Sequence, residues 1–278
     1  MVRILISGGD GNLSQIIKKH LYNQHEIISL SRKEVNFLNF NEIDSFFKNN
    51  SNFDVLIHTA IVGGRRTKED NHDVVYNNLL MFENIIQFAH LFKIIINFDS
   101  GAIYDRETDI YNRKENELLT VPKDYYGFSK YLIYKRSLSY NNVFNFRIFN
   151  IFHTTEESDR FIKSCFISKL NNKSVKIFQD KYFDFVYEDD FIEIIKHYIN
   201  NCNSRDNLIK TFNLSYQQKY KLSDVAKMIM KNDTMIEIIN PNLTNNYSGD
   251  SIELDKMNIQ LDGLEKSLEK YYTKYSKL

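Results

Sequence analysis

The chain has 278 residues, a length that predicts either one large α/β unit or a nucleotide-binding domain with a smaller lobe. Its Lys+Arg count of 36 equals its Asp+Glu count of 36, so no overall field would hold it to a nucleic acid or an anionic membrane, and we expect neither partner. The composition, 42% hydrophobic and 14% aromatic, excludes a disordered chain.

Short apolar runs alternate with amphipathic ones along the first half of the chain. Strands are expected at residues 3–6, 27–30, 55–57 and 94–98, and helices at residues 13–22, 42–48 and 74–92. Strands that are apolar throughout and connected by helices belong in a parallel sheet covered on both faces. The predicted fold is therefore α/β, a Rossmann-type doubly wound parallel sheet that binds its ligand at the carboxyl ends of its strands.

The second half continues the alternation without a Gly/Ser-rich or Pro-rich linker. It predicts strands at residues 175–178, 183–187 and 211–214, and helices at residues 161–170, 190–200 and 222–230. We therefore predict a dinucleotide-binding domain over residues 1–150 and a smaller α/β substrate-binding lobe over residues 151–278, partly interleaved with it.

Cysteine usage and the lack of long apolar runs bear on the compartment. Cys165 and Cys202 have neither disulfide-type nor metal-type spacing, and no apolar run approaches the roughly 20 residues that cross a bilayer. These features favour a cytoplasmic protein without a structural metal.

A glycine cluster, SGGDGNLS at residues 7–14, follows the first strand directly and opens a helix. Gly8 and Gly11 allow a tight turn beside a pyrophosphate, whose charge the helix N-terminus meets. We assign Gly8, Gly11, Asn12 and Leu13 to the cofactor. The alternative is a plain strand-to-helix turn, which the position at the first βα junction disfavours.

The end of the second strand indicates which dinucleotide binds. An NAD site usually offers an acid there for the ribose 2′-hydroxyl, whereas residues 29–33 read SLSRK and the first carboxylate is Glu34. We assign Ser31 and Arg32 to the 2′-phosphate of NADP, because a guanidinium makes paired charge-assisted hydrogen bonds. A solvated loop charge is the alternative for Arg32.

Ser100, Tyr126 and Lys130 supply the groups that carbonyl reduction needs. A free phenol has a pKa of about 10, so it requires a neighbouring cation to act as a general acid near neutral pH. Tyr126 and Lys130 are four residues apart and share a helix face, and Ser100 ends the strand before them. A second Tyr-x-x-x-Lys pair, Tyr131 and Lys135, has the same spacing, but Tyr131 belongs to an apolar stripe.

Several motifs follow one another along the chain. They are the glycine cluster, HTA at residues 58–60, Asn78, SGAIY at residues 100–104, YGFSK at residues 126–130, RIFN at residues 147–150 and DFVYEDD at residues 184–190. Together they resemble the extended short-chain dehydrogenases/reductases that act on nucleotide sugars. The resemblance covers about residues 1 to 230. Residues 32–38 and 60–64 make it most similar to GDP-fucose synthase-like, NADP-dependent 4-keto reductases.

The resemblance implies further roles. It places Asn36 and Phe37 near the adenine, and Thr59, Ala60, Ile61, Asn78 and Phe149 beside the cofactor. It places Gly63, Ala102, Asn150 and Arg160 at the substrate, and it implies a homodimer built from the helices that contain Val74 and Tyr126. Arg160 is alternatively a plain surface charge.

The chain departs from the family pattern at several positions. Ser14 replaces the third glycine, His153 stands at a usual Gly, and Phe183 stands where an Arg often touches the substrate phosphate. Residues 101–102 are Gly-Ala in place of the Asp-Glu pair of 4,6-dehydratases, and the Cys and His of epimerising synthases correspond to Ala102 and Arg160.

These features predict an NADPH-dependent reduction of a 4-keto nucleoside-diphosphate (deoxy)sugar to its 4-hydroxy form, for surface polysaccharide biosynthesis. Two alternatives remain open: a nucleotide-sugar 4-epimerase with tightly bound NAD, and a non-catalytic NADP-binding protein of the same fold. The nucleotide and the sugar are not specified by any motif.

Overall fold

The computed structural model describes residues 1–65, 68–242 and 244–276. The chain forms two compact units, each built from several segments. Unit 1 comprises Met1–Asp105, Leu118–Arg147 and Ile194–Phe212, and unit 2 comprises Arg106–Glu117, Ile148–Glu193 and Asn213–Leu278.

A six-stranded sheet forms the centre of unit 1, in the order β10-β6-β4-β3-β1-β2. The strands are β1 (Arg3–Ser7), β2 (Glu26–Leu30), β3 (Val55–His58), β4 (Ile94–Ser100), β6 (Val143–Ile148) and β10 (Thr211–Leu214). β1 pairs in parallel with β2 on one side and with β3 on the other, and β3 pairs in parallel with β4. The order of the strands therefore changes direction at β1, and sheets of this kind bind ligands at such a point. The prediction of a Rossmann-type α/β fold is confirmed.

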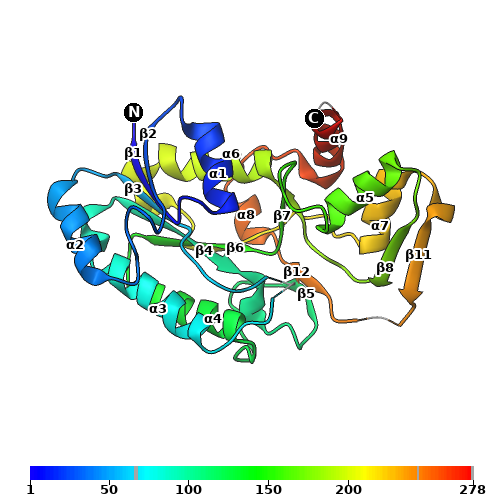
Figure 1. Ribbon diagram of the computed structural model, residues 1–278, viewed down its shortest axis with the longest axis horizontal. Helices are drawn as coiled ribbons and strands as arrows, with labels where there is room; N and C mark the ends of the chain where they lie inside the picture. Colours follow the sequence, from blue (N-terminus) through cyan, green and yellow to red (C-terminus); the bar gives the residue numbers. More distant parts are fainter. Residues whose placement is uncertain (66–67, 243, 277–278) are drawn as a thin grey trace. The chain divides into compact units, whose positions relative to one another are not determined.

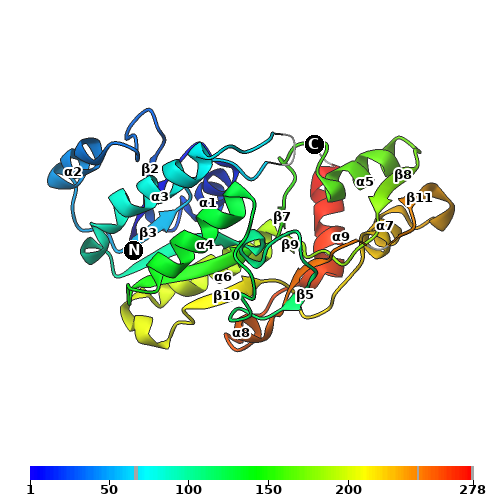
Figure 2. The same ribbon diagram turned by 90° about the horizontal axis from the view of Figure 1, so that it is seen from below.

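Helices cover both faces of this sheet (Figures 1 and 2). Helices α3 (Asp73–Ile86) and α4 (Tyr125–Ser137) lie side by side on one face, with α2 (Phe40–Asn49) near the β2 edge. Helices α1 (Asn12–Leu21) and α6 (Glu188–Asn200) lie on the other face. Short 3-10 helices follow at η1 (Ala89–Leu91), η2 (Gly101–Tyr104) and η3 (Cys202–Asn207).

Alternating side chains of the strands build a core on each face of the sheet. Leu5, Leu56 and Ile95 pack with Phe82 and Ile85 of α3 in one buried cluster. On the other face the ring of Tyr198 in α6 lies against strand aromatics, with centroid distances of 4.6 Å to Phe146 and 5.9 Å to Phe212. Burial of this apolar surface is the main stabilising contribution to the unit.

Unit 2 contains short parallel strand pairs and a helical cluster. Its elements are β5 (Ile110–Arg113), β7 (Ile151–Phe152), α5 (Phe161–Leu170), β8 (Val175–Gln179), β9 (Val186–Tyr187), α7 (Leu222–Met230), η4 (Asp233–Met235), β11 (Ile236–Asn240), β12 (Tyr247–Gly249), α8 (Ile252–Asp255) and α9 (Gly263–Tyr275). β11 pairs with β8, β12 with β5, and β7 with β9. Phe166, Val225 and Tyr271 are among the buried residues of its core.

Two predicted elements are shorter in the structure. The helix expected over residues 74–92 ends at Ile86 and is followed by the turn η1, which returns the chain to β4. The strand expected over residues 183–187 retains only Val186–Tyr187, because Asp184 turns its side chain inward to accept a hydrogen bond from the Gly249 N–H at 2.8 Å. Helices α5 and α7 begin and end at the predicted residues.

Within the described residues, we find no helix with the length and apolar character needed to span a membrane.

Candidate cofactor and active site

Gly8 follows β1 in a conformation that excludes a side chain. Its φ is +75°, and a Cβ there would lie 2.8 Å from both the Cα and the N of Ala60. The Gly11 N–H donates to the Gly8 carbonyl at 2.9 Å, and Gly11 is the N-cap of α1 without a side-chain cap. The first turn of α1 therefore presents backbone N–H groups to an anion, as Asn12 and Leu13 require for their predicted role.

Ser14, which replaces the third glycine of the fingerprint, is accommodated by hydrogen bonds. Its side chain is buried, and its hydroxyl donates to the Gly8 carbonyl at 2.9 Å and lies 2.6 Å from Thr59 Oγ1. The hydroxyl thus links α1 to the turn after β1 and to the residue after β3. Where a glycine would allow close packing of the helix, the Ser14 hydroxyl holds α1 in place by hydrogen bonds.

The end of β2 carries a carboxylate that sequence reasoning did not place there. Glu34 folds back so that its Oε2 accepts from the Ser31 N–H at 2.7 Å and from the Ser31 hydroxyl. These hydrogen bonds lower the pKa of Glu34. Arg32 is exposed, and its assignment to the 2′-phosphate stays a prediction. The three-residue spacing between Ser31 and Glu34 was the available signal, since such spacing is typical of local side-chain capping.

Asn36 and Phe37, expected near the adenine, differ in exposure. The Phe37 side chain is buried in the core, and its carbonyl accepts from Asn84 Nδ2 at 3.0 Å. Asn36 Oδ1 accepts from the Leu38 N–H at 3.2 Å, which shapes the turn before α2. The Asn36 N–H donates to Glu42 Oε2 at 2.8 Å, and the Asn36 carbonyl accepts from the Asn39 N–H at 2.8 Å, so this turn is held by internal hydrogen bonds. The place of Asn36 and Phe37 near the adenine stays a prediction.

Asn78 positions the loop that follows β3. Its Oδ1 accepts from the Val62 N–H at 2.8 Å, and its Nδ2 donates to the Val62 carbonyl and to Ser129 Oγ, both at 3.0 Å. This buried amide thus ties Val62, the residue after Thr59, Ala60 and Ile61, to helices α3 and α4. The place of Asn78 beside the cofactor stays a prediction.

Helix α4 carries Tyr126 and Lys130 against the carboxyl end of β4. Asp124 caps the helix by accepting from the Gly127 N–H at 2.8 Å, and Gly127 packs so closely that a Cβ would lie 2.7 Å from the Ala102 carbonyl. Lys130 Nζ donates to the Phe98 carbonyl at 2.5 Å and lies 5.8 Å from the centroid of the Tyr126 ring.

Ser100 is the last residue of β4, two residues beyond Phe98. Its hydroxyl accepts from the Ala102 N–H at 3.2 Å and caps η2, the short helix that packs against α4. The end of β4, η2 and the first turns of α4 thus gather the three predicted catalytic residues in one region of unit 1.

Burial shapes the electrostatics of this region. It lowers the pKa of Lys130 to about 8, with the charge of Asp99 acting in the opposite direction. Burial, aided by the charge of Lys130, lowers the pKa of His58 to about 3, and His58 Nδ1 lies 2.8 Å from Ser7 Oγ. At neutral pH the site therefore combines a mostly protonated lysine with a neutral histidine.

The second Tyr-x-x-x-Lys pair lies in a different environment. Lys135 is exposed, with its Nζ 5.4 Å from the Tyr131 ring centroid, whereas Lys130 is only 6% exposed. An exposed ammonium is screened by water and perturbs a phenol weakly. The two lysine-to-ring distances are similar, and the burial of Lys130 favours Tyr126 and Lys130 over Tyr131 and Lys135.

The residues predicted to contact the substrate are divided between the units. In unit 1, Gly63 has a φ of +84°, Ala102 is buried, and a Cβ on Gly64 would lie 2.8 Å from the Tyr126 ring. In unit 2, the Phe149 ring lies 5.0 Å from that of Tyr247, and the Asn150 carbonyl accepts from the Val186 N–H at 2.9 Å. Arg160 is the N-cap of α5, and its Nε lies 3.7 Å from the carboxylate of the buried Glu156.

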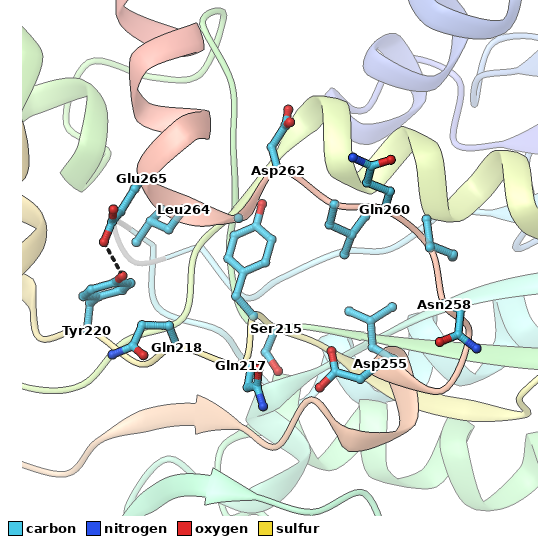
Figure 3. A pocket seen from close by; sticks show the side chains of 15 residues that line it. Ser215, Gln217, Gln218, Tyr220, Asp255, Asn258, Gln260, Asp262, Leu264 and Glu265 are labelled. Carbon is cyan, nitrogen blue, oxygen red and sulfur yellow. Dashed lines mark hydrogen bonds between the residues drawn. The ribbon is translucent and has the colours of Figure 1, made fainter.

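A separate pocket of about 640 Å³ lies within unit 2, between the segment after β10 and the segment that precedes α9 (Figure 3). Gln217, Gln218, Asn258 and Gln260 bring amide side chains to it, and Tyr220 donates to Glu265 at 2.7 Å. The described residues that line it include carboxylates but no lysine, arginine or histidine. Its acidic lining makes it a poor site for a phosphate group.

Residues 4–214 match the model of the NAD dependent epimerase/dehydratase family. No curated protein matches the chain. Among solved structures, the chain is similar to dTDP-4-dehydrorhamnose reductase from Bacillus anthracis in complex with NADP, at 17% identity, a TM-score of 0.80 and coverage of 99% of each chain.

Two other solved structures are similar over the whole chain. GDP-mannoheptose C4 reductase from Campylobacter jejuni with NADP bound shares 19% identity at a TM-score of 0.80, covering 100% of this chain and 98% of that one. UDP-N-acetylglucosamine 4-epimerase from Bacillus cereus shares 17% identity at a TM-score of 0.79, with the same coverage. At these identities the likenesses establish the fold.

Proposed function

Because the chain belongs to the NAD dependent epimerase/dehydratase family, we propose that it reduces a 4-keto nucleoside-diphosphate (deoxy)sugar to the 4-hydroxy sugar with NADPH, for surface polysaccharide biosynthesis. The observation that carries the proposal is the buried Lys130 ammonium 5.8 Å from the Tyr126 ring, beside the strand end that bears Ser100. Two structurally similar reductases were solved with NADP, which supports the choice of cofactor.

The residues present fit a dinucleotide. Gly8 leaves a cradle that a Cβ would fill, and the uncapped first turn of α1 beside it suits a pyrophosphate. Gly11, Asn12 and Leu13 would hold the phosphates, and Thr59, Ala60 and Ile61 would line the cofactor on the β3 side. When bound there, NADPH would supply the hydride for reduction at C4 of the sugar.

The chain supplies the proton and the orientation. The Tyr126 phenol gives its proton to the C4 oxygen, and the Ser100 hydroxyl donates a hydrogen bond to the same oxygen. The Lys130 ammonium stabilises the phenolate that remains after proton transfer. Gly101 and Ala102 offer no carboxylate for removing water from the sugar, so a dehydratase activity is not proposed.

A nucleotide-sugar 4-epimerase with tightly bound NAD is a second candidate, and one observation favours it. Glu34 returns its carboxylate to the end of β2, where NAD sites hold the ribose 2′-hydroxyl. An epimerase would retain the dinucleotide through purification and show no net consumption of NADPH.

The decisive experiment follows NADPH absorbance with a panel of 4-keto nucleotide sugars carrying GDP, UDP, dTDP or CDP. The proposal expects NADPH consumption with at least one of them and product reduced at C4. Interconversion of 4-hydroxy sugars without NADPH consumption, by a protein purified with NAD, would establish the epimerase.

We also propose a cytoplasmic homodimer. Both cysteines, Cys165 and Cys202, are buried free thiols, which suits a reducing compartment. Helices α3 and α4 lie side by side. Tyr76 on α3 and Leu138, the residue that caps the C-terminus of α4, have exposed side chains, which would pack in a helical interface between two copies.

A further inference from the structure

Three lysines lie in or beside the segment that precedes β9 in unit 2, and they differ in their partners. Lys219 Nζ lies 3.0 Å from Asp184 Oδ2, and both side chains are buried, so this ammonium is neutralised. Lys181 is half-buried and makes no ion pair or side-chain hydrogen bond within the described part of the chain. Its Nζ lies 5.6 Å from the centroid of the Phe183 ring.

The backbone fixes the side of the segment on which Lys181 lies. Tyr182 forms an antiparallel bridge with Lys221, and Phe183 forms a parallel bridge with Tyr247. Side chains alternate along extended backbone, so Lys181 and Phe183 share one face and Tyr182 lies on the other. Lys221 Nζ lies 5.5 Å from the Tyr182 ring centroid, and Lys221 is therefore a matched cation on the opposite side.

Aromatic rings continue from Lys181 along its own face. The centroid of the Phe183 ring lies 5.3 Å from that of Tyr247, and the Tyr247 centroid lies 5.0 Å from that of Phe149, the residue that the family resemblance places beside the cofactor. Phe183 and Tyr247 are partly exposed. A ligand extending from Phe149 over these rings would reach the Lys181 ammonium.

Burial lowers the pKa of Lys181, and no carboxylate among the residues that the structure describes counteracts that effect. A partly desolvated ammonium without a counterion gains more from binding an anion than a fully solvated lysine does. Because Phe183 occupies the position where related enzymes often have an arginine for the substrate phosphate, a cation two residues earlier on the same face can compensate for that loss.

We propose that Lys181 binds the diphosphate of the nucleotide sugar and replaces the arginine that is absent at position 183. This inference rests on the proposed function, since it takes a nucleoside diphosphate as the ligand. Lys181 contacts the substrate phosphates and takes no part in hydride or proton transfer.

The test is isothermal titration calorimetry of the full-length chain, saturated with NADP, with GDP, UDP, dTDP and CDP in turn. The wild-type protein, Lys181→Gln, Lys181→Arg and the matched control Lys221→Gln are compared, with thermal melting to confirm that each variant is folded. Because a charged hydrogen bond is lost, Lys181→Gln should lower the affinity for the preferred nucleoside diphosphate by about tenfold or more. Lys181→Arg retains most of the affinity, and NADP affinity is unchanged in all variants.

Two negative outcomes are distinguishable. If the wild-type protein binds NADP but none of the four nucleoside diphosphates, the proposed substrate class is wrong and the inference falls with it. If the wild-type protein binds one of them and Lys181→Gln binds it as well as Lys221→Gln does, the inference alone is overturned.

Discussion

At the scale of single residues, the charge of Lys130 sets the expected pH dependence. Burial lowers the pKa of this lysine to about 8, so its ammonium is present below that pH and is lost above it. Without the ammonium, the Tyr126 phenolate is destabilised, and kcat/KM for reduction should fall as the pH rises through about 8. A pH–rate profile that stays flat to about pH 10 would contradict this role, since a solvated lysine titrates only there.

The Arg147 guanidinium is fully buried, and its charge is balanced by the carboxylate of Asp99. Its Nε donates to Asp99 Oδ2 at 2.8 Å, and its Nη1 donates to the Tyr104 hydroxyl at 2.5 Å. The sequence indicated Arg147 only as part of a family motif. Its partner Asp99 lies 48 residues earlier in the chain and is brought close because β4 and β6 are neighbours in the sheet although they are not consecutive in the chain.

Asp99→Asn leaves the Arg147 charge uncompensated and is expected to lower the free energy of unfolding by about 3–5 kcal/mol. Glu83→Gln, which breaks the exposed 2.7 Å pair with Arg136, is the control and should cost less than about 1 kcal/mol. Urea denaturation measures both changes. Equal losses in the two variants would show that Asp99 does not compensate a buried charge.

At the scale of elements, the turn between β1 and α1 depends on a glycine in the left-handed region. Gly8→Ala adds conformational strain of about 1–2 kcal/mol and a Cβ 2.8 Å from the Ala60 backbone. Gly263 has nearly the same φ, +76°, but a Cβ there would meet nothing within 4 Å, so Gly263→Ala carries the strain without the clash.

We therefore expect Gly8→Ala to weaken NADPH binding at least about tenfold, the loss of about 1.4 kcal/mol, while Gly263→Ala leaves it unchanged. Fluorescence titration with NADPH measures the two affinities. Wild-type affinity in Gly8→Ala would mean that the dinucleotide does not approach this turn.

Local pattern predicted most elements because period and polarity act within a few residues. Strands β1, β2, β3, β4 and β10 of unit 1 and helices α5 and α7 follow directly from apolar runs and helical spacing, whereas strand β6 was not predicted. The shortened strand β9 did not follow, because its end is decided by Asp184 bonding to Gly249, 65 residues away. Glu34 was likewise missed, because its folding back to Ser31 depends on the turn that contains it.

At the scale of the whole molecule, two segments of the chain belong to a different unit from the residues that flank them in sequence. Residues 106–117 belong to unit 2 and residues 194–212 return to unit 1, and no change in composition marks either crossing. The unit to which such a segment belongs is determined by pairing with residues far away in the chain, as between β5 and β12. The local pattern of one sequence does not contain this information.

The expected homodimer is tested by light scattering after size-exclusion chromatography. We expect a mass of twice 33.1 kDa for the wild-type protein. Leu138→Glu should shift the protein towards the monomer, because dimerisation would remove the new carboxylate from water at an unfavourable free energy. A monomeric wild-type protein at micromolar concentration would contradict the dimer.

The most direct test of the catalytic account compares Tyr126→Phe with Tyr131→Phe in NADPH-dependent reduction of the accepted 4-keto sugar. Removing the proton donor should slow turnover by about 100-fold or more while NADPH affinity is retained. Tyr131→Phe, the matched change beside an exposed lysine, should turn over at the wild-type rate. Equal rates in the two variants would contradict the assignment of Tyr126 as the proton donor.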